Sequence, residues 1–143
     1  MTTAATDAAA VVTRLAAVSG VRWTDEQVVD PEEARRYSRL HGYEREISEV
    51  APPGYSAALV MRAVLMVLHD VRLALPFDRN VHAAQALDWI RPLRVGERLT
   101  TQAWVESVRL RERAVFFDVA TISTDDAGGR CLTGVSTHAV RHG

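Results

Sequence analysis

Residues suited to acid–base chemistry gather around His41. Tyr43 and Glu44 follow it closely, and imidazole is the side chain whose ordinary pKa suits proton transfer near neutral pH. We therefore predict that His41 acts as a base, that Glu44 orients it or serves as the acid, and that Tyr43 contacts substrate. Glu46 and Glu49 are further carboxylate candidates. The alternative is a histidine that stabilises a helix end, beside carboxylates solvated in a loop.

His82 is the second candidate, at the start of a predicted strand. We expect it to assist His41 from a channel near a subunit interface, and the alternative is a strand-end histidine bonded to backbone. Asp88 follows at an even spacing, which predicts that it shares a face with His82. We expect its charge to be balanced by Arg91 or Arg94.

Backbone donors are predicted where Pro52-Pro53-Gly54 begins a long helix. The first turn of a helix has free N–H groups and the positive end of the dipole, which together stabilise an anionic oxygen. Pro53 has no N–H, so Gly54 and Tyr55 are the predicted substrate-binding donors. The alternative is that Pro-Pro-Gly only turns the chain into the helix.

The helix that starts at Gly54 is predicted to be the centre of the fold. From Gly54 to Arg72 it would be roughly 28 Å long at about 1.5 Å per residue. It is apolar almost all round, which predicts that it is enclosed. Shorter elements precede it, a helix at residues 7–18 and a short strand at residues 24–29.

A further helix is predicted from Asp30-Pro31 to about Gly42. The aspartate accepts from free N–H groups and the proline fits the first turn. Ala34, Tyr37 and Leu40 are expected to face inward. His41 is therefore expected at the C-terminal end of this helix.

Four long strands are predicted after the central helix, at residues 81–91, 97–110, 113–124 and 130–141. One helix followed by antiparallel strands predicts an α+β domain whose sheet wraps around the helix. We take residues 1–143 as a single domain, with residues 1–27 as an N-terminal helical extension. Both faces of the third strand carry aromatic residues, so we expect a partner chain to cover one face.

The composition of the 143 residues narrows the function. The chain is 48% hydrophobic and 24% charged with a net charge of −1, and without a basic stripe we expect neither nucleic acid nor a membrane as partner. The one cysteine excludes a disulfide framework and a thiolate metal cage. His138 and His142 alternate on the last strand without a third ligand, so no metal site is predicted. We expect a cytoplasmic protein, because the start lacks the basic residues of a signal peptide.

Three segments together resemble the hot-dog fold of the MaoC-like dehydratase group. Residues 51–55 (Ala-Pro-Pro-Gly-Tyr) are similar to the APPTF entry to that fold's central helix, and residues 82–85 (His-Ala-Ala-Gln) to its HGEQ segment. Residues 91–97 (Arg-Pro-Leu-Arg-Val-Gly-Glu) are similar to RPLRxGD. The order and spacing of these segments most resemble the N-terminal, substrate-binding type of (3R)-hydroxyacyl-thioester dehydratase domain.

The resemblance implies a dehydratase or hydratase of 3-hydroxyacyl or enoyl thioesters in fatty-acid or polyketide metabolism, without a cofactor. The substrate would be carried on coenzyme A or acyl carrier protein. It also implies a homodimer, or a heterodimer with a second hot-dog chain. Catalytic members carry Asp-x-Asn-Pro-x-His before the central helix, and that motif is absent here.

Several interpretations therefore stay open. The chain is a lyase that uses His41, Glu44 and His82, or it is a non-catalytic subunit that holds substrate for a partner with the motif. A thioesterase of the same fold, in which Glu44 or Asp78 activates water, is a third interpretation. A polyketide cyclase or isomerase is a fourth.

Overall fold

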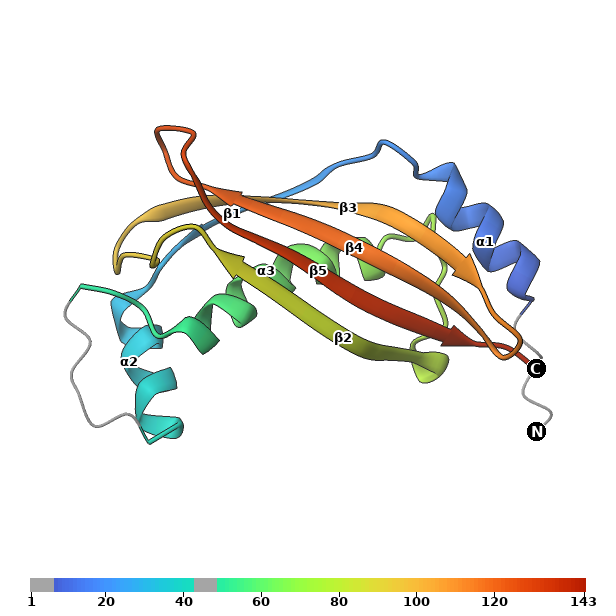
Figure 1. The fold of residues 1–143 in the computed structure, drawn as a ribbon, viewed down its shortest axis with the longest axis horizontal. Helices are drawn as coiled ribbons and strands as arrows, with labels where there is room; N and C mark the ends of the chain where they lie inside the picture. The colour runs from blue at the N-terminus through green and yellow to red at the C-terminus, as the bar shows by residue number, and fades with distance from the viewer. Residues whose placement is uncertain (1–6, 43–48) are drawn as a thin grey trace.

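The computed structural model describes residues 7–42 and 49–143, which form one antiparallel sheet and three α-helices (Figure 1). The sheet has the order β1-β3-β4-β5-β2. Its strands are β1 (Trp23–Val28), β2 (Asn80–Trp89), β3 (Arg98–Leu110), β4 (Ala114–Thr124) and β5 (Arg130–Arg141). The helices are α1 (Ala8–Ala17), α2 (Pro31–Leu40) and α3 (Pro53–Leu68), with a 3-10 turn η1 (Phe77–Arg79) before β2. The predicted α+β hot-dog arrangement is confirmed.

The central helix α3 lies under the curved sheet and packs mainly against β1, β3 and β4 (Figure 1). Its buried side includes Leu59, Val60, Val64 and Val67, which join one continuous core with the sheet. Burial of this apolar side is the main driving force for the two layers to pack. The expectation that α3 is enclosed all round is wrong for the single chain, because Leu65 and Met66 on this helix are 43% and 40% exposed.

The helix α3 ends at Leu68, four residues before the predicted end at Arg72. The Asp70 carboxylate accepts from the backbone N–H of Arg72 and from its guanidinium, both at 2.9 Å. The indole of Trp23 donates to the same carboxylate at 3.0 Å. These bonds hold a turn that a continuing helix would not allow, and Arg72 lowers the pKa of Asp70.

The helix α2 begins as predicted and differs in which side is buried. Asp30 accepts from the N–H groups of Glu32 and Glu33 at 2.7 and 3.1 Å. Leu40, expected to face inward, is 74% exposed, whereas Ser38 is buried. The reason is that α2 contacts the start of α3 through Glu33 and Tyr37, and its last turn extends beyond the core.

A β-bulge between His82 and Ala84 shifts the pairing of β2 with β5 by one residue. His82 pairs with His138, and Asp88 pairs with Thr133. Because neighbours in a pair share a face, the extra residue puts His82 on the inner face and Asp88 on the outer face. The expectation that they share a face is therefore wrong, since even spacing assumes an unbroken ladder.

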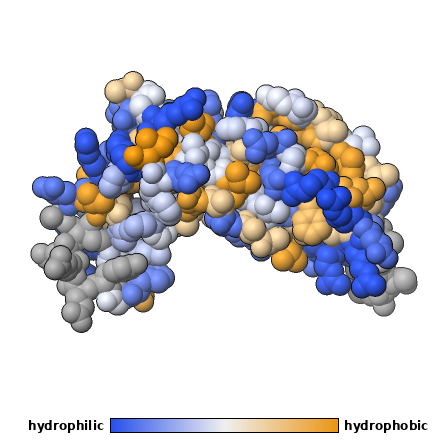
Figure 2. Space-filling model, viewed as in Figure 1, coloured by the Kyte–Doolittle hydropathy of each residue, from blue (hydrophilic) through white to orange (hydrophobic). Residues whose placement is uncertain are grey.

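Several large apolar side chains are exposed on α3 and at the end of β2. Leu65 and Met66 of α3 are 43% and 40% exposed, and Trp89 at the end of β2 is 42% exposed. Figure 2 shows apolar surface interspersed with charged surface and a hollow along one side of the molecule. In the part of the chain that the structure describes, no helix has both the length and the apolar character needed to cross a bilayer.

The helix α1 shares the core of the sheet, which leads to a test of how far the N-terminal extension contributes to stability. Leu15 is 1% exposed and belongs to the same buried cluster as Val64. Leu15→Ala should lower the free energy of unfolding by about 2–5 kcal/mol, measured by urea denaturation. The exposed neighbour Thr13 is the control, and Thr13→Ala should change it by less than about 0.5 kcal/mol. An equally small effect of Leu15→Ala would mean that α1 is not part of the cooperative core.

Candidate active site

The helix α2 contacts the start of α3 through Glu33 and Tyr37, and Tyr37 links His41, at the C-terminal end of α2, to the predicted backbone donors. The imidazole of His41 stacks on the ring of Tyr37 at 4.0 Å between centroids, and its Nδ1 lies 2.9 Å from the Tyr37 carbonyl oxygen. A carbonyl can only accept, so Nδ1 carries the hydrogen and the neutral ring presents a lone pair at Nε2. His41 is exposed. The contact that caps the helix thus also orients a potential base.

Gly54 is required by a close approach of Tyr37. A Cβ at Gly54 would overlap the Tyr37 hydroxyl, so a glycine lets the tyrosine lie flat against the first turn of α3. Among the described residues, the Gly54 N–H makes no backbone hydrogen bond, as expected in a first helical turn. This N–H and the helix dipole can bind a carbonyl or an oxyanion.

Tyr55 contributes in a different way from that predicted. Its N–H donates to the Pro52 carbonyl at 2.9 Å, so it is engaged within the chain. Its buried hydroxyl donates to Glu33 at 2.9 Å. Burial and the neighbouring Glu33 carboxylate raise the pKa of Tyr55, so the phenol stays neutral. Tyr55 therefore ties α3 to α2 and forms an apolar wall with Tyr37, whose ring lies 6.0 Å away edge to face.

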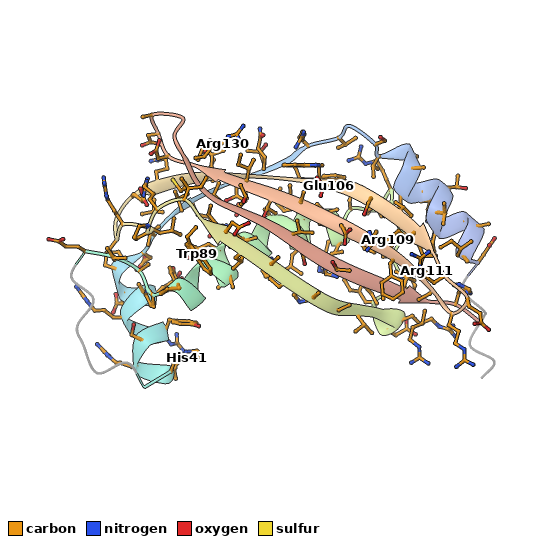
Figure 3. The ribbon with its side chains drawn as sticks, in the orientation of Figure 1. His41, Trp89, Glu106, Arg109, Arg111 and Arg130 are labelled. Carbon is orange, nitrogen blue, oxygen red and sulfur yellow. The ribbon has the colours of Figure 1, made fainter. Side chains whose placement is uncertain are left out.

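Trp89 closes the site from the sheet. Its indole donates to the hydroxyl of Ser56 at 3.1 Å, which joins the end of β2 to the first turn of α3. Figure 3 shows Trp89 beside this turn and His41 at the far end of α2. Three elements therefore meet at the start of α3, and the site is built from residues distant in sequence.

The predicted site residues are only partly brought together. Gly54 and Tyr55 lie in the first turn of α3 and His41 is connected to them through Tyr37, while Tyr43, Glu44 and Glu46 lie outside the described residues. Glu49 is exposed.

His82 lies apart from this group. It is at the opposite end of β2 from Trp89, about 20 Å along the strand. A single chain therefore does not place His82 beside His41.

His82 belongs to a second polar cluster that includes Ser136 and His138. The Ser136 hydroxyl lies 3.1 Å from His82 Nε2 and 2.8 Å from His138 Nε2. The two imidazoles stack at 5.0 Å, and His138 also stacks on Phe117 at 5.4 Å. The sequence pattern suggests His138 only as a metal ligand. It does not contain the strand register, and the bulge in β2 is what puts these residues side by side.

Burial lowers the pKa of His138 to about 4, with a smaller contribution from His82. His138 is 1% exposed. It is therefore neutral at physiological pH, and the buried hydroxyl of Ser136 bridges the two rings.

The charge of Asp88 is not balanced by Arg91. The Arg91 guanidinium instead binds Glu97 in a bidentate pair at 2.9 and 2.7 Å and reaches Asp125 at 3.1 Å. This network holds the turn before β3 against the β4–β5 hairpin. Within the described residues Asp88 forms no ion pair with Arg91 or with the alternative partner Arg94, and the Arg91 guanidinium is instead held by Glu97 and Asp125.

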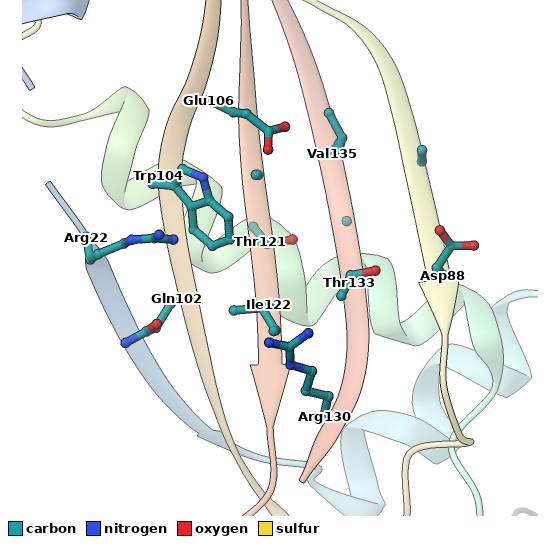
Figure 4. Close-up of a pocket in the computed structure, with 13 residues that line it drawn as sticks. Arg22, Asp88, Gln102, Trp104, Glu106, Thr121, Ile122, Arg130, Thr133 and Val135 are labelled. Carbon is teal, nitrogen blue, oxygen red and sulfur yellow. The ribbon is translucent and has the colours of Figure 1, made fainter. Parts of the chain in front are cut away.

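A hollow of about 600 Å³ lies on the outer face of the sheet, away from α3. Figure 4 shows Arg22, Trp104 and Asp88 around it, with α3 behind the strands. The Arg22 guanidinium sits 3.6 Å from the centre of the Trp104 ring. In the described ranges, no group of three or more His, Cys, Asp or Glu side chains could hold a metal ion.

Comparisons with known proteins define the class. The fold is that of the hot-dog dehydratases of the MaoC-like group, as three solved structures illustrate. The HadBC complex, a 3R-hydroxyacyl-ACP dehydratase of Mycobacterium tuberculosis, matches with a TM-score of 0.68 and 18% identity over 83% of this chain and 94% of its own. HtdX of the same organism gives 0.72 and 20% over 85% and 51%. R-hydratase PhaJ1 of Pseudomonas aeruginosa gives 0.63 and 16% over 87% and 82%.

The family model described as FAS1-like, dehydratase domain region, matches residues 16–133, and the chain belongs to this family. A UPF0336 protein of Streptomyces avermitilis is 32% identical over 92 residues, 64% of this chain and 61% of the relative. A UPF0336 protein of Cutibacterium acnes is 29% identical over 83% of this chain and 85% of its own length. The chain spans 61% of the first of these relatives and 56% of the one from Streptomyces coelicolor.

The buried neutral imidazole of His138 makes stability depend on pH. Its folded pKa of about 4 lies below the ordinary value of 6.5, so the unfolded chain binds the proton first and stability falls as pH drops from 6.5 toward 4. This group should contribute about 2 kcal/mol less at about pH 5 than at about pH 7.5 in urea denaturation. His138→Gln should remove that difference, and His142→Gln should retain it. Identical pH dependence in wild type and His138→Gln would contradict the assignment.

Proposed function

We propose that this chain binds acyl thioesters at the start of α3 and interconverts 3-hydroxyacyl and enoyl thioesters as a dehydratase or hydratase. The observation that carries the proposal is that Tyr37 contacts both Gly54, whose N–H has no backbone partner among the described residues, and His41, whose Nε2 lone pair is available. Family membership supports the same chemistry. Coenzyme A or acyl carrier protein would carry the acyl group, within cytoplasmic fatty-acid or polyketide metabolism.

In the dehydration direction, His41 Nε2 takes the proton from the carbon next to the thioester carbonyl. The electron pair moves to the carbonyl oxygen, where the Gly54 N–H and the α3 dipole stabilise the developing charge. The carbon–oxygen bond at the next carbon then breaks as the pair returns to form the double bond. The hydroxyl leaves as water with the proton from His41 or from an acid, for which Glu44 stays the prediction.

A second candidate is a substrate-binding subunit without activity of its own. The absence of Asp-x-Asn-Pro-x-His favours it. So does the likeness to a dehydratase whose solved form is a complex of chains. In this candidate the start of α3 holds the thioester, and a partner hot-dog chain supplies the acid and base.

We propose that the assembly is a dimer formed through β2 and α3. Within the described residues, β2 pairs with β5 on one side and leaves its other edge open. Its ten residues contain no proline, lysine or arginine, the usual guards of an edge strand. The exposed Leu65 and Met66 lie on the side of α3 that the sheet leaves uncovered.

Leu65→Glu should convert the dimer to a folded monomer, because it puts a charge into an apolar contact while the side chain is already solvated in the single chain. Sedimentation equilibrium measures the mass, and circular dichroism checks the fold. Val28→Glu is the matched control, since Val28 is equally exposed on β1 at the opposite edge of the sheet. A wild-type monomer, or a dimer that survives Leu65→Glu, would rule out this interface.

Turnover is tested with crotonyl-coenzyme A and a longer trans-2-enoyl analogue, followed by loss of absorbance of the conjugated thioester. Wild type should hydrate at least one of them, and His41→Ala should lower kcat/KM at least about 100-fold, the usual contribution of a general base. His142→Ala is the matched control and should retain the wild-type rate.

Thioester binding is measured separately by titration calorimetry on the same proteins. Binding without turnover would replace the lyase by the substrate-binding subunit. The absence of both binding and turnover would refute the two candidates together. Wild-type rates in His41→Ala would keep the activity and remove His41 from it.

A further inference from the structure

The hydrogen bonds within the cluster of His82, Ser136 and His138 restrict which ring nitrogen of each histidine can carry a hydrogen. Both imidazole Nε2 atoms lie within hydrogen-bond distance of the same hydroxyl. His138 Nδ1 is buried and makes no hydrogen bond to the described residues. In this hydrogen-bonded series, His138 at one end is buried in the core and His82 at the other end is exposed.

Counting hydrogens leaves three arrangements. The Ser136 hydroxyl has a single hydrogen and can donate to at most one Nε2. If it donates to neither, both Nε2 atoms donate to its oxygen, and the buried hydroxyl hydrogen has no acceptor among the described residues. If it donates to His138, that neutral ring must carry its hydrogen at Nδ1, where a buried N–H has no acceptor among the described residues. If it donates to His82, then His138 Nε2 donates to Ser136, and only a lone pair at His138 Nδ1 is left without a partner. A buried donor without a partner is rarer and costlier than a buried acceptor, so donation to His82 is favoured.

We infer that Ser136 and His138 are positioning residues that fix neutral His82 as the Nδ1–H tautomer, so that His82 presents an N–H donor on the inner face of the sheet. The ligand group that this donor fits is a neutral oxygen acceptor, such as a carbonyl or a hydroxyl.

The assignment rests on the proposed function only for the ligand that His82 would meet, and it revises the part that His82 plays. A neutral Nδ1–H donor orients or polarises an oxygen, whereas proton removal is left to His41. The tautomer itself is a property of the free protein and can be measured without substrate or turnover.

The test is nitrogen NMR of the imidazoles in uniformly nitrogen-15-labelled protein at about pH 8, where ordinary imidazoles are neutral. His82 should show a protonated Nδ1 and an unprotonated Nε2, the reverse of the usual preference of free imidazole side chains. Ser136→Ala should return His82 to the Nε2–H form. Thr137→Ala is the matched control, because this neighbouring hydroxyl of β5 binds Asp118 on the outer face instead.

An Nε2–H tautomer of His82 in the wild type, or an unchanged tautomer in Ser136→Ala, would overturn the inference. His138→Phe gives an independent check. It keeps an aromatic ring at this position and removes both ring nitrogens of His138, so His82 should lose its preference for the Nδ1–H tautomer. If the tautomer is as inferred but crotonyl-coenzyme A is neither bound nor hydrated, the proposed function is refuted, and the role of Ser136 and His138 in fixing the tautomer of His82 is retained. A KM that rises in Ser136→Ala with an unchanged kcat would place the donor in substrate binding.

Discussion

Burial of α3 against the inner face of the sheet is the constraint on which the rest of the structure depends. The helix contributes a buried side of aliphatic residues to the one core that all strands share. Because most of its surface packs against the sheet, only its two ends and one exposed side are accessible to a ligand or a partner. The N-terminal end carries the Gly54 N–H, which has no backbone partner among the described residues, and the exposed side carries Leu65 and Met66. The proposed chemistry and the proposed association thus use separate parts of one helix.

The two polar clusters follow from the length of that helix and of β2. His41 and Gly54 lie at one end, and His82 with Ser136 lies at the other, so one chain does not combine them. An edge strand that pairs with a second copy about a two-fold axis puts the start of β2 beside the end of its copy. In the proposed dimer this arrangement would bring His82 of one chain toward the α3 N-terminus of the other.

The fold could be predicted from local signals because they agree with one another. The Asp7 and Asp30 caps, the Pro-Pro-Gly entry and the turn at residues 125–129 each define an element on their own. The positions of His41 at the end of α2 and of Gly54 in the first turn of α3 could be predicted, because helix ends have local sequence signals. Ser136, His138 and the true face of Asp88 depend on one extra residue in β2, and neither composition nor periodicity encodes a bulge. The partners of Arg91 depend on tertiary packing in the same way.

The most direct test of the central claim is the carbonyl stretching frequency of crotonyl-coenzyme A bound to the protein, measured by difference infrared spectroscopy with a carbon-13 label at the thioester carbonyl. The account predicts a shift to lower frequency on binding, because the Gly54 N–H and the positive end of α3 polarise the carbonyl. A bound thioester whose carbonyl stretch equals that in water or lies above it would contradict the claim that the start of α3 is where thioester chemistry occurs.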